Sequence, residues 1–227
     1  MKNLVAIYKP KGPTSHDVVD AVRRATGVKK VGHAGTLDPL ARGVLVVAIG
    51  REATKLLSVT VQKDKEYVAI IRLGTTSHTD DAEGLLTKTP KPFSRPSPGE
   101  VTPVVMKYKG TFAQIPPAFS AVKNKGLKAY FLARAGKIPV LKPRAVTIYD
   151  IEILDYTWPD LRLRVHCGPG VYIRSLARDI GSALGTGGYL ADLERTRVGE
   201  WTSERALQYD TIDITLPPLI SDNNTEK

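Results

Sequence analysis

The chain has 227 residues, enough to bury a full core as one large domain or as two small ones. Hydrophobic residues make up 42% of the chain and charged residues 25%, as in ordinary globular proteins, and no apolar run is long enough to cross a bilayer. Lysine and arginine number 33 against 23 aspartates and glutamates, and the resulting net charge of +10 favours a polyanionic partner.

The cysteine and histidine content argues against a metal or disulfide protein. The single cysteine, Cys167, excludes an internal disulfide and a cysteine-based metal site. The four histidines are far apart in the sequence and lack metal-ligand spacing, so we expect no metal. The N-terminal apolar stretch is too short for a secretion signal and runs directly into Lys9-Pro10-Lys11. We therefore expect a cytoplasmic protein that does not contact membranes.

The first predicted elements are a short strand and a helix. Leu4 to Tyr8 reads as a strand, followed by a turn over Lys9 to Pro13. Thr14 or Ser15 can cap a helix over about Ser15 to Thr26, and Gly27 can end it.

The next segment, Gly32 to Gly43, surrounds one carboxylate, Asp38, with glycines, a histidine and an arginine. The apolar run Val44 to Ile49 follows at once and is typical of a buried strand. Pro39 biases Asp38 toward an extended conformation, and a loop held on a rigid strand can present a reactive group. Asp-Pro and glycine are also ordinary turn chemistry, so composition alone leaves a surface turn open.

The middle of the chain is predicted to hold one strand and two connections. In Lys65 to Leu73, successive side chains alternate between two faces with a period of two residues, which is typical of a strand. A polar loop follows over Thr75 to Gly84, and Lys88 to Pro103 contains five prolines and reads as an exposed connection. A short helix is expected around Lys128 to Ala135.

The last third supplies two strands and a helix. The strands are expected over Ala145 to Tyr156 and Leu161 to Cys167, and the helix over Val171 to Leu184, before a glycine-rich turn. Strands and helices intermix without strict alternation, which favours an α+β fold with a mixed, mainly antiparallel sheet flanked by helices. We expect one domain over residues 1–210 and a C-terminal tail over 211–227.

Basic charge is concentrated in residues 101–145, which we call the basic segment. It holds nine lysines or arginines and no acidic residue. Five aromatic residues are interleaved with the cations: Tyr108, Phe112, Phe119, Tyr130 and Phe131. Cations contact phosphates and aromatic faces stack on unpaired bases, so this mixture suits single-stranded or looped RNA. The alternative is a solvated basic face that aids solubility.

Several motifs, taken together and in order, resemble the bacterial tRNA pseudouridine synthases of the TruB type, which isomerise uridine 55 in the T arm of tRNA. The resemblance spans roughly residues 4–210. The motifs are Lys9-Pro10-Lys11-Gly12-Pro13-Thr14-Ser15-His16-Asp17, the Gly32 to Gly43 run, Lys65-Glu66-Tyr67, Pro116-Pro117-Ala118-Phe119-Ser120-Ala121-Val122-Lys123 and Gly170-Val171-Tyr172-Ile173-Arg174.

The resemblance implies catalytic roles for three residues and a pseudouridine synthase fold with an RNA-gripping insertion. Asp38 matches the family's reacting aspartate, Arg174 the arginine that pairs with it, and Tyr67 the tyrosine that stacks on the target base. The isomerisation involves no redox change, so no cofactor is expected. A cation beside Asp38 would lower the pKa of its carboxyl group. Whether Asp38 attacks the base or acts on the sugar is left open.

The resemblance also implies RNA-binding roles. Tyr172 and Leu190 match residues that line the uridine pocket, and His33 matches the histidine that contacts nucleotides displaced when the uridine flips out. Lys9 matches a segment that braces the catalytic loop. Two further cations are expected to contact RNA: Arg42, and Lys123 in the basic segment, which overlaps the family's mobile insertion.

The sequence departs from the family in three places. Tyr8 stands where an acidic residue is common, and Ala34 and Arg42 stand where threonine is common. About eighteen residues follow Tyr209, too few for the small C-terminal RNA-binding domain, often of the PUA class, that most members carry.

Three other functions stay open. The first is a guide-RNA-dependent pseudouridine synthase subunit, although Thr75 to Gly84 looks more like the stand-alone form. The second is an RNA-binding tRNA chaperone with weak catalysis. The third is a glycoside hydrolase, whose second carboxylate would come from Asp80, Asp81 or Glu83. The expected partner is the T arm of tRNA, bound by a monomer with no obligatory protein partner.

Overall fold

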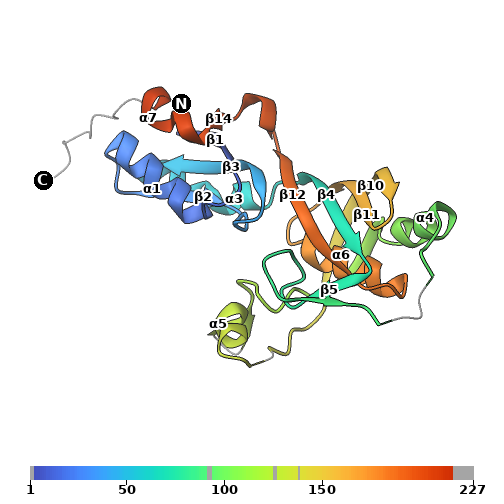
Figure 1. Ribbon diagram of the computed structural model, residues 1–227. Coiled ribbons are helices and arrows are strands. Elements are labelled where there is room, and N and C mark those ends of the chain that lie inside the picture. Colours follow the sequence, from blue (N-terminus) through green and yellow to red (C-terminus); the bar gives the residue numbers. More distant parts are fainter. Residues whose placement is uncertain (1–2, 91–93, 125–126, 138, 217–227) are drawn as a thin grey trace, which may run out of the picture. The chain divides into compact units, whose positions relative to one another are not determined.

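The structure is a computed structural model, which describes residues 3–90, 94–124, 127–137 and 139–216. The chain divides into two compact units (Figure 1). Unit 1 comprises Met1–Glu66 and Glu194–Lys227, and unit 2 comprises Tyr67–Leu193. The chain passes from one unit to the other within two strands, β4 (Lys65–Leu73) and β12 (Gly188–Val198). Among the described residues, no helix combines the length and the apolar character needed to cross a membrane.

Unit 1 is built around β3 (Arg42–Ile49). The strand β1 (Leu4–Lys9) pairs antiparallel with β3, and every residue of β1 takes part in this pairing. On the other side, β2 (Val31–Ala34) pairs antiparallel with the second half of β3, and β12 pairs parallel with its first two residues. Two short strands extend this unit, β13 (Trp201–Thr202) beside β12 and β14 (Leu207–Gln208) parallel to β1.

The helix α1 (Ser15–Thr26) forms where the sequence predicts it. Thr14 is the N-cap: its side chain accepts from the Asp17 amide, and Asp17 accepts from the Thr14 amide at 2.7 Å. Gly27 ends the helix in the left-handed region at φ 71°, which costs glycine no steric strain. Its buried face packs against β1 and β3, together with Ile212.

The apolar run predicted as a buried strand is β3, and it is covered on both faces. Leu45 and Val47 face the core that α1 covers, whereas Val44 and Val46 face a second cluster with Ala34 and other residues. A strand buried on both faces reads as continuous rather than alternating hydrophobicity. Burial on both sides makes β3 a rigid support for the loop that precedes it.

The remaining elements of unit 1 are short. They are α2 (Arg51–Lys55), α3 (Leu57–Val61), two 3₁₀ turns over Ser203–Arg205 and Tyr209–Thr211, and α7 (Ile212–Thr215). The helix α7 lies within the segment expected as a C-terminal tail, and its Ile212 is buried. Residues 217–227 of that expected tail lie outside the described residues. The single domain over 1–210 stays a prediction.

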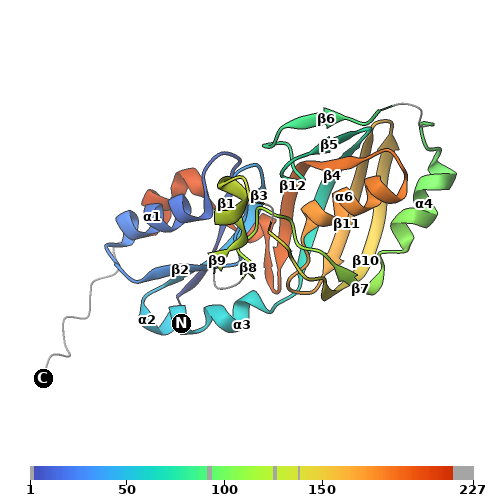
Figure 2. The ribbon, with the colours of Figure 1, turned by 90° about the horizontal axis from the view of Figure 1, so that it is seen from below.

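Unit 2 contains β12, β4, β11 (Asp160–Cys167), β10 (Arg144–Thr157) and β7 (Gly110–Gln114), in that spatial order. The strand β10 is antiparallel to both of its neighbours. The helix α6 (Ile173–Ala183) crosses one face of this sheet, and α4 (Pro98–Met106) lies along β10 (Figure 2). Two hairpins lie outside the sheet, and they pair β5 (Thr75–Ser77) with β6 (Leu86–Lys88) and β8 (Lys123–Asn124) with β9 (Leu127–Lys128). The short helix α5 (Ala129–Arg134) follows β9.

The α+β prediction, with a mixed and mainly antiparallel sheet flanked by helices, is confirmed. The expected exposed connection over Lys88 to Pro103 is wrong in its second half, because α4 begins at Pro98. Ser97 and Glu100 form a capping box, and proline is favourable in the first turn of a helix. The prediction of a connection relied on the five prolines. It overlooked the capping-box pattern Ser-x-x-Glu, which is present in the sequence and indicates the start of a helix.

Candidate active site

The Asp38 loop, residues 35–41, connects β2 to β3 and is tied to the start of α1. The Ser15 hydroxyl accepts from the Leu37 amide at 2.8 Å and donates to the Leu37 carbonyl at 3.0 Å. The Gly12 amide donates to the Pro39 carbonyl at 2.9 Å, and the Ala41 amide donates to the Asp38 carbonyl at 3.0 Å. The residues on both sides of Asp38 are therefore fixed, while Asp38 itself is only half-buried.

A buried arginine, Arg195 on β12, holds the backbone of the Asp38 loop by hydrogen bonds. Its guanidinium donates to the carbonyls of Gly35 at 3.0 Å, Thr36 at 3.5 Å and Val44 at 2.8 Å. Gly43 lets the two strands approach: its φ is 113°, and a Cβ there would overlap the Arg195 carbonyl oxygen. Sequence reasoning missed Arg195, because an arginine in a strand is ordinarily an exposed residue.

Lys9, at the end of β1, is fully buried, and its ammonium donates to the carbonyls of Pro10 and Pro13, both at 2.8 Å. These bonds fold the turn that carries Gly12, whose amide contacts the Asp38 loop. The role of Lys9 in a segment that braces the catalytic loop stays a prediction.

Arg42, at the start of β3, forms an ion pair with Glu194 on β12, with Nε and Nη2 both 3.2 Å from Oε2. The Tyr8 hydroxyl donates to the other oxygen of Glu194 at 3.0 Å. Burial raises the pKa of Tyr8 above its usual value, and the hydrogen bond to Glu194 adds to the shift. Arg42 is thus held beside β12 by Glu194, and its contact with an RNA phosphate stays a prediction.

His33 lies in β2, half-buried, and its Nδ1 is buried with no hydrogen-bond partner among the described residues. Burial lowers the pKa of His33, and the positive charges of Arg195 and His16 lower it further. Both effects disfavour the protonated form of the His33 imidazole.

In unit 2, Arg174 lies in the first turn of α6 and is 8% exposed. Its guanidinium is 3.3 Å from Asp81 Oδ2, donates to the Thr79 carbonyl at 3.3 Å and donates to the Phe119 carbonyl at 3.0 Å. Asp81 is 2% exposed, and it also accepts from the Thr79 hydroxyl at 2.5 Å. The guanidinium is thus held by two separate segments of unit 2.

The start of α6 is fixed by a buried glutamine. Gln114, at the end of β7, donates to the Tyr172 carbonyl at 3.1 Å and accepts from the Tyr172 amide at 2.9 Å. Tyr172 is the N-cap residue, so this paired contact sets where the first turn of the helix begins. Arg174 follows two residues later, and its position depends on this contact. Nothing in the sequence singled out Gln114.

The remaining predicted site residues of unit 2 lie on strands. Tyr67 is on β4 and 7% exposed, and Leu190 is on β12 and fully buried, with its amide donating to the Asp80 carbonyl at 3.0 Å. Lys123 lies in β8, and its side chain is outside the described part of the structure.

Each unit therefore gathers its own set of candidate residues. Unit 1 groups Lys9, His33 and Arg42 around the Asp38 loop, and unit 2 links Tyr172, Arg174 and Leu190 through segments 79–81 and 114–119. In the described residue ranges, no three histidine, cysteine, aspartate or glutamate side chains are placed to hold a metal ion.

The chain matches two family models that together cover most of its length. Residues 23–173 match the N-terminal domain of the TruB family of pseudouridylate synthases. Residues 174–215 match the C-terminal domain of tRNA pseudouridylate synthase B.

Curated relatives give the same result. The chain is 46% identical to tRNA pseudouridine synthase B of Thermobifida fusca (strain YX), over 95% of this chain and 76% of that protein. It is 42% identical to the protein of the same name from Corynebacterium jeikeium (strain K411), over 92% of this chain and 70% of that protein.

Among solved structures, a Cbf5–Nop10–Gar1 complex matches with a TM-score of 0.70 and 32% identity, over 92% of this chain and 53% of that chain. An archaeal box H/ACA sRNP Nop10–Cbf5 complex matches with a TM-score of 0.68 and 29% identity, over 93% and 52%. The chain thus spans about three quarters or less of these curated relatives and about half of the chains in these structures.

Proposed function

Because this chain belongs to the TruB family of pseudouridylate synthases, we propose that it isomerises uridine 55 in the T arm of tRNA to pseudouridine, with Asp38 as the reacting carboxylate. The observation that carries the proposal is the construction of the Asp38 loop. Ser15, Gly12 and Arg195 hold its backbone at three points, while Asp38 itself stays half-buried. Because the loop backbone is already fixed, the Asp38 carboxylate needs little further ordering to reach a reactive position against a bound substrate.

The reaction needs a carboxylate and a means to move protons. The bond from the sugar C1′ to N1 of the base breaks, a bond from C1′ to C5 forms, C5 loses a proton and N1 gains one. Asp38 can add to the sugar or the base, or can assist proton loss from the sugar, and each route begins with an ionised carboxylate. Atoms and electrons balance within the nucleoside, so the step needs no redox partner.

Arg174 is the proposed cation that keeps Asp38 ionised. Its contacts with Asp81 and Phe119 support this role, because a guanidinium held by two segments loses little freedom when it acts. Tyr67 is the proposed stacking partner of the target base, and Tyr172 and Leu190 are the proposed pocket walls.

Base flipping is the proposed route by which the uridine reaches Asp38. The loss of stacking and base pairing costs on the order of a few kcal/mol. His33 is proposed to contact the displaced nucleotides. The basic segment, with Lys123, is proposed to contact the phosphates.

A stand-alone enzyme is favoured over a guide-dependent subunit. The curated relatives at 42–46% identity are named tRNA pseudouridine synthase B, whereas the solved complexes with Nop10 match at 29–32%. The proposed active form is accordingly a monomer without an obligatory protein partner. A tRNA substrate makes the cytoplasm its proposed location.

The test is incubation of the purified protein with bare, unmodified tRNA and mapping of pseudouridine at single-nucleotide resolution. We expect modification at position 55 alone, and none in a tRNA that carries cytidine there. Modification at another position would contradict the proposed site, and no modification without added guide RNA and proteins would favour the guide-dependent alternative.

A further inference from the structure

Two arginines, one turn apart on α6, tie the same two segments together. Arg174 contacts Asp81 in the first segment, residues 79–81, and the Phe119 carbonyl in the second, residues 115–119. Arg178 repeats this arrangement one turn later. Residues four apart lie on the same side of a helix, so the two guanidinium groups form successive clamps.

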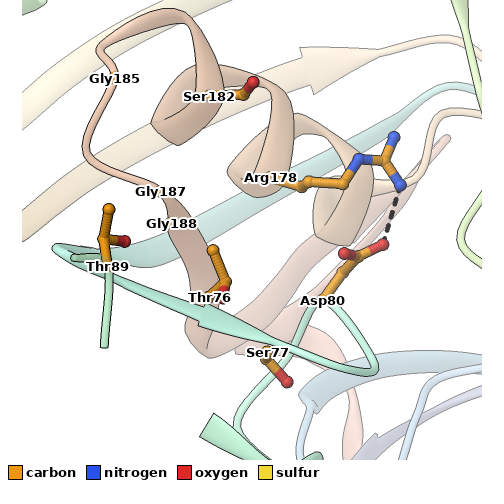
Figure 3. A pocket seen from close by; sticks show the side chains of 9 residues that line it. All are labelled: Thr76, Ser77, Asp80, Thr89, Arg178, Ser182, Gly185, Gly187 and Gly188. Atoms are coloured by element: carbon orange, nitrogen blue, oxygen red, sulfur yellow. Dashed lines mark hydrogen bonds and ion pairs between the residues drawn. The ribbon is translucent and has the colours of Figure 1, made fainter. Parts of the chain in front are cut away.

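All three nitrogens of the Arg178 guanidinium are in use. Nη1 is 2.9 Å from Asp80 Oδ2, Nη2 donates to the Ile115 carbonyl at 2.9 Å, and Nε donates to Asp179 at 2.9 Å. The Asp80 side chain is 15% exposed, which limits the screening of this ion pair by water. Figure 3 shows the Arg178 side chain reaching from the helix to Asp80.

Asp80 connects this second clamp to the candidate site. Its φ is 63°, a conformation that few residues other than glycine, asparagine and aspartate adopt without strain. Its carbonyl accepts from the Leu190 amide, and the next residue, Asp81, carries the carboxylate that contacts Arg174. A displacement of Asp80 would therefore move both Leu190 and Asp81.

A pocket of about 380 Å³ leaves Asp80 without close packing on one side (Figure 3). Its lining consists of polar and small residues and includes both Asp80 and Arg178. Because open space borders Asp80 here, the ion pair rather than side-chain packing holds its position on this side.

We propose that the Asp80–Arg178 ion pair is a positioning device for the isomerisation: it fixes Asp81 and, through Asp81, the guanidinium of Arg174. This inference rests on the proposed function, in which Arg174 assists Asp38. Neither Asp80 nor Arg178 needs to touch the RNA.

The test compares Asp80→Asn, Arg178→Gln and the double variant. Asparagine keeps the size of aspartate and tolerates positive φ, so the first variant removes only the charge. We expect each single variant to lower kcat about tenfold or more while KM for tRNA stays unchanged, because misplacement of a catalytic group slows the chemical step. The double variant should lose no more activity than the worse single variant, since both remove one interaction.

A matched control is the ion pair of Arg72 with Asp160, which lies in the same unit and has two hydrogen bonds of 2.8 Å. Asp160→Asn should leave kcat and KM unchanged. The conservative variant Arg178→Lys should recover part of the kcat lost in Arg178→Gln, because the ammonium retains the charge but cannot reach all three acceptors. An unchanged kcat in Asp80→Asn and Arg178→Gln, with wild-type melting temperatures, would overturn the inference.

A second readout needs no activity. The Nε–H group of Arg174 should give a slowly exchanging NMR signal in the wild type, and Asp80→Asn should speed its exchange by about tenfold through loss of local order. If the wild type fails to modify tRNA, the proposed function is wrong, and the Arg174 exchange rate still decides the structural claim. An exchange rate that Asp80→Asn does not change would contradict it.

Discussion

The hydroxyl of Ser15 binds both polar groups of Leu37, the residue immediately before Asp38: it accepts from the amide at 2.8 Å and donates to the carbonyl at 3.0 Å. Ser15 is 2% exposed and begins α1. One buried side chain thus couples the start of a helix to the loop that carries the candidate nucleophile.

Replacement of Ser15 by alanine should leave the Leu37 amide and carbonyl unpaired in a buried position. We expect a loss of about 1–3 kcal/mol in the free energy of unfolding. We also expect a lower kcat with an unchanged Kd for tRNA, since Asp38 would lose its fixed backbone. Denaturant unfolding and single-turnover kinetics measure the two effects. Ser58→Ala, at an exposed serine of α3, is the control, and an equal loss of stability in both variants would refute the anchoring role.

Arg195→Met should destabilise the protein by about 2–5 kcal/mol, because three carbonyl oxygens lose their donor at once. The control is Arg197→Gln, two residues along the same strand, which breaks a partly exposed ion pair with Asp64 worth about 1 kcal/mol or less. Chemical denaturation of both variants tests this difference. Similar losses would show that Arg195 is not the loop's main support.

We expect His33 to make the free energy of unfolding fall at acidic pH. Burial and nearby positive charge hold its pKa below the usual value of 6.5, so the unfolded chain binds the proton more readily than the folded protein. Stability is complete above pH 6.5 and declines as the pH falls from there through the folded-state pKa. In His33→Gln, the free energy of unfolding should fall less as the pH is lowered. Urea titrations over about two pH units, from roughly pH 7 to roughly pH 5, measure this difference. A wild-type slope in His33→Gln would contradict the assignment.

The basic segment predicts a strong salt dependence of tRNA binding. Replacing Lys123, Lys125 and Lys128 with glutamine should lower affinity and reduce the slope of log K against log salt by about two to three units, as expected when three phosphate contacts are lost. Lys125 lies outside the described residues, so this prediction rests on charge alone.

The control for this triple variant removes three cations that lie outside the basic segment and are paired with carboxylates: Arg72, Lys55 and Arg164, paired with Asp160, Glu52 and Glu152. Their replacement by glutamine should change the salt slope little. Equal slopes in the two triple variants would place the RNA-binding surface elsewhere.

Local patterns predicted the elements that carry their own signals. Thr14 and Gly27 gave both ends of α1, the continuous apolar run gave β3, and the period-two alternation gave β4 with Tyr67 on its buried face. By contrast β12 was not predicted, because buried Arg195 interrupts its apolar pattern, and its contacts are made to residues far away in the sequence.

The candidate site divides in the same way. The motifs that carry the family resemblance supplied Asp38, His33 and Arg174. Their supports were not predicted, because Asp81 and Gln114 matter only through contacts across more than 50 residues. Polar residues that act through burial and long-range pairing leave no local pattern to detect.

The central claim is that the Asp38 carboxylate performs the isomerisation. The most direct measurement is single-turnover mapping of pseudouridine at position 55 of tRNA with wild type and Asp38→Asn, after both have been shown to bind tRNA equally. We expect full conversion by the wild type and none by Asp38→Asn. Conversion by Asp38→Asn at the wild-type rate would contradict it.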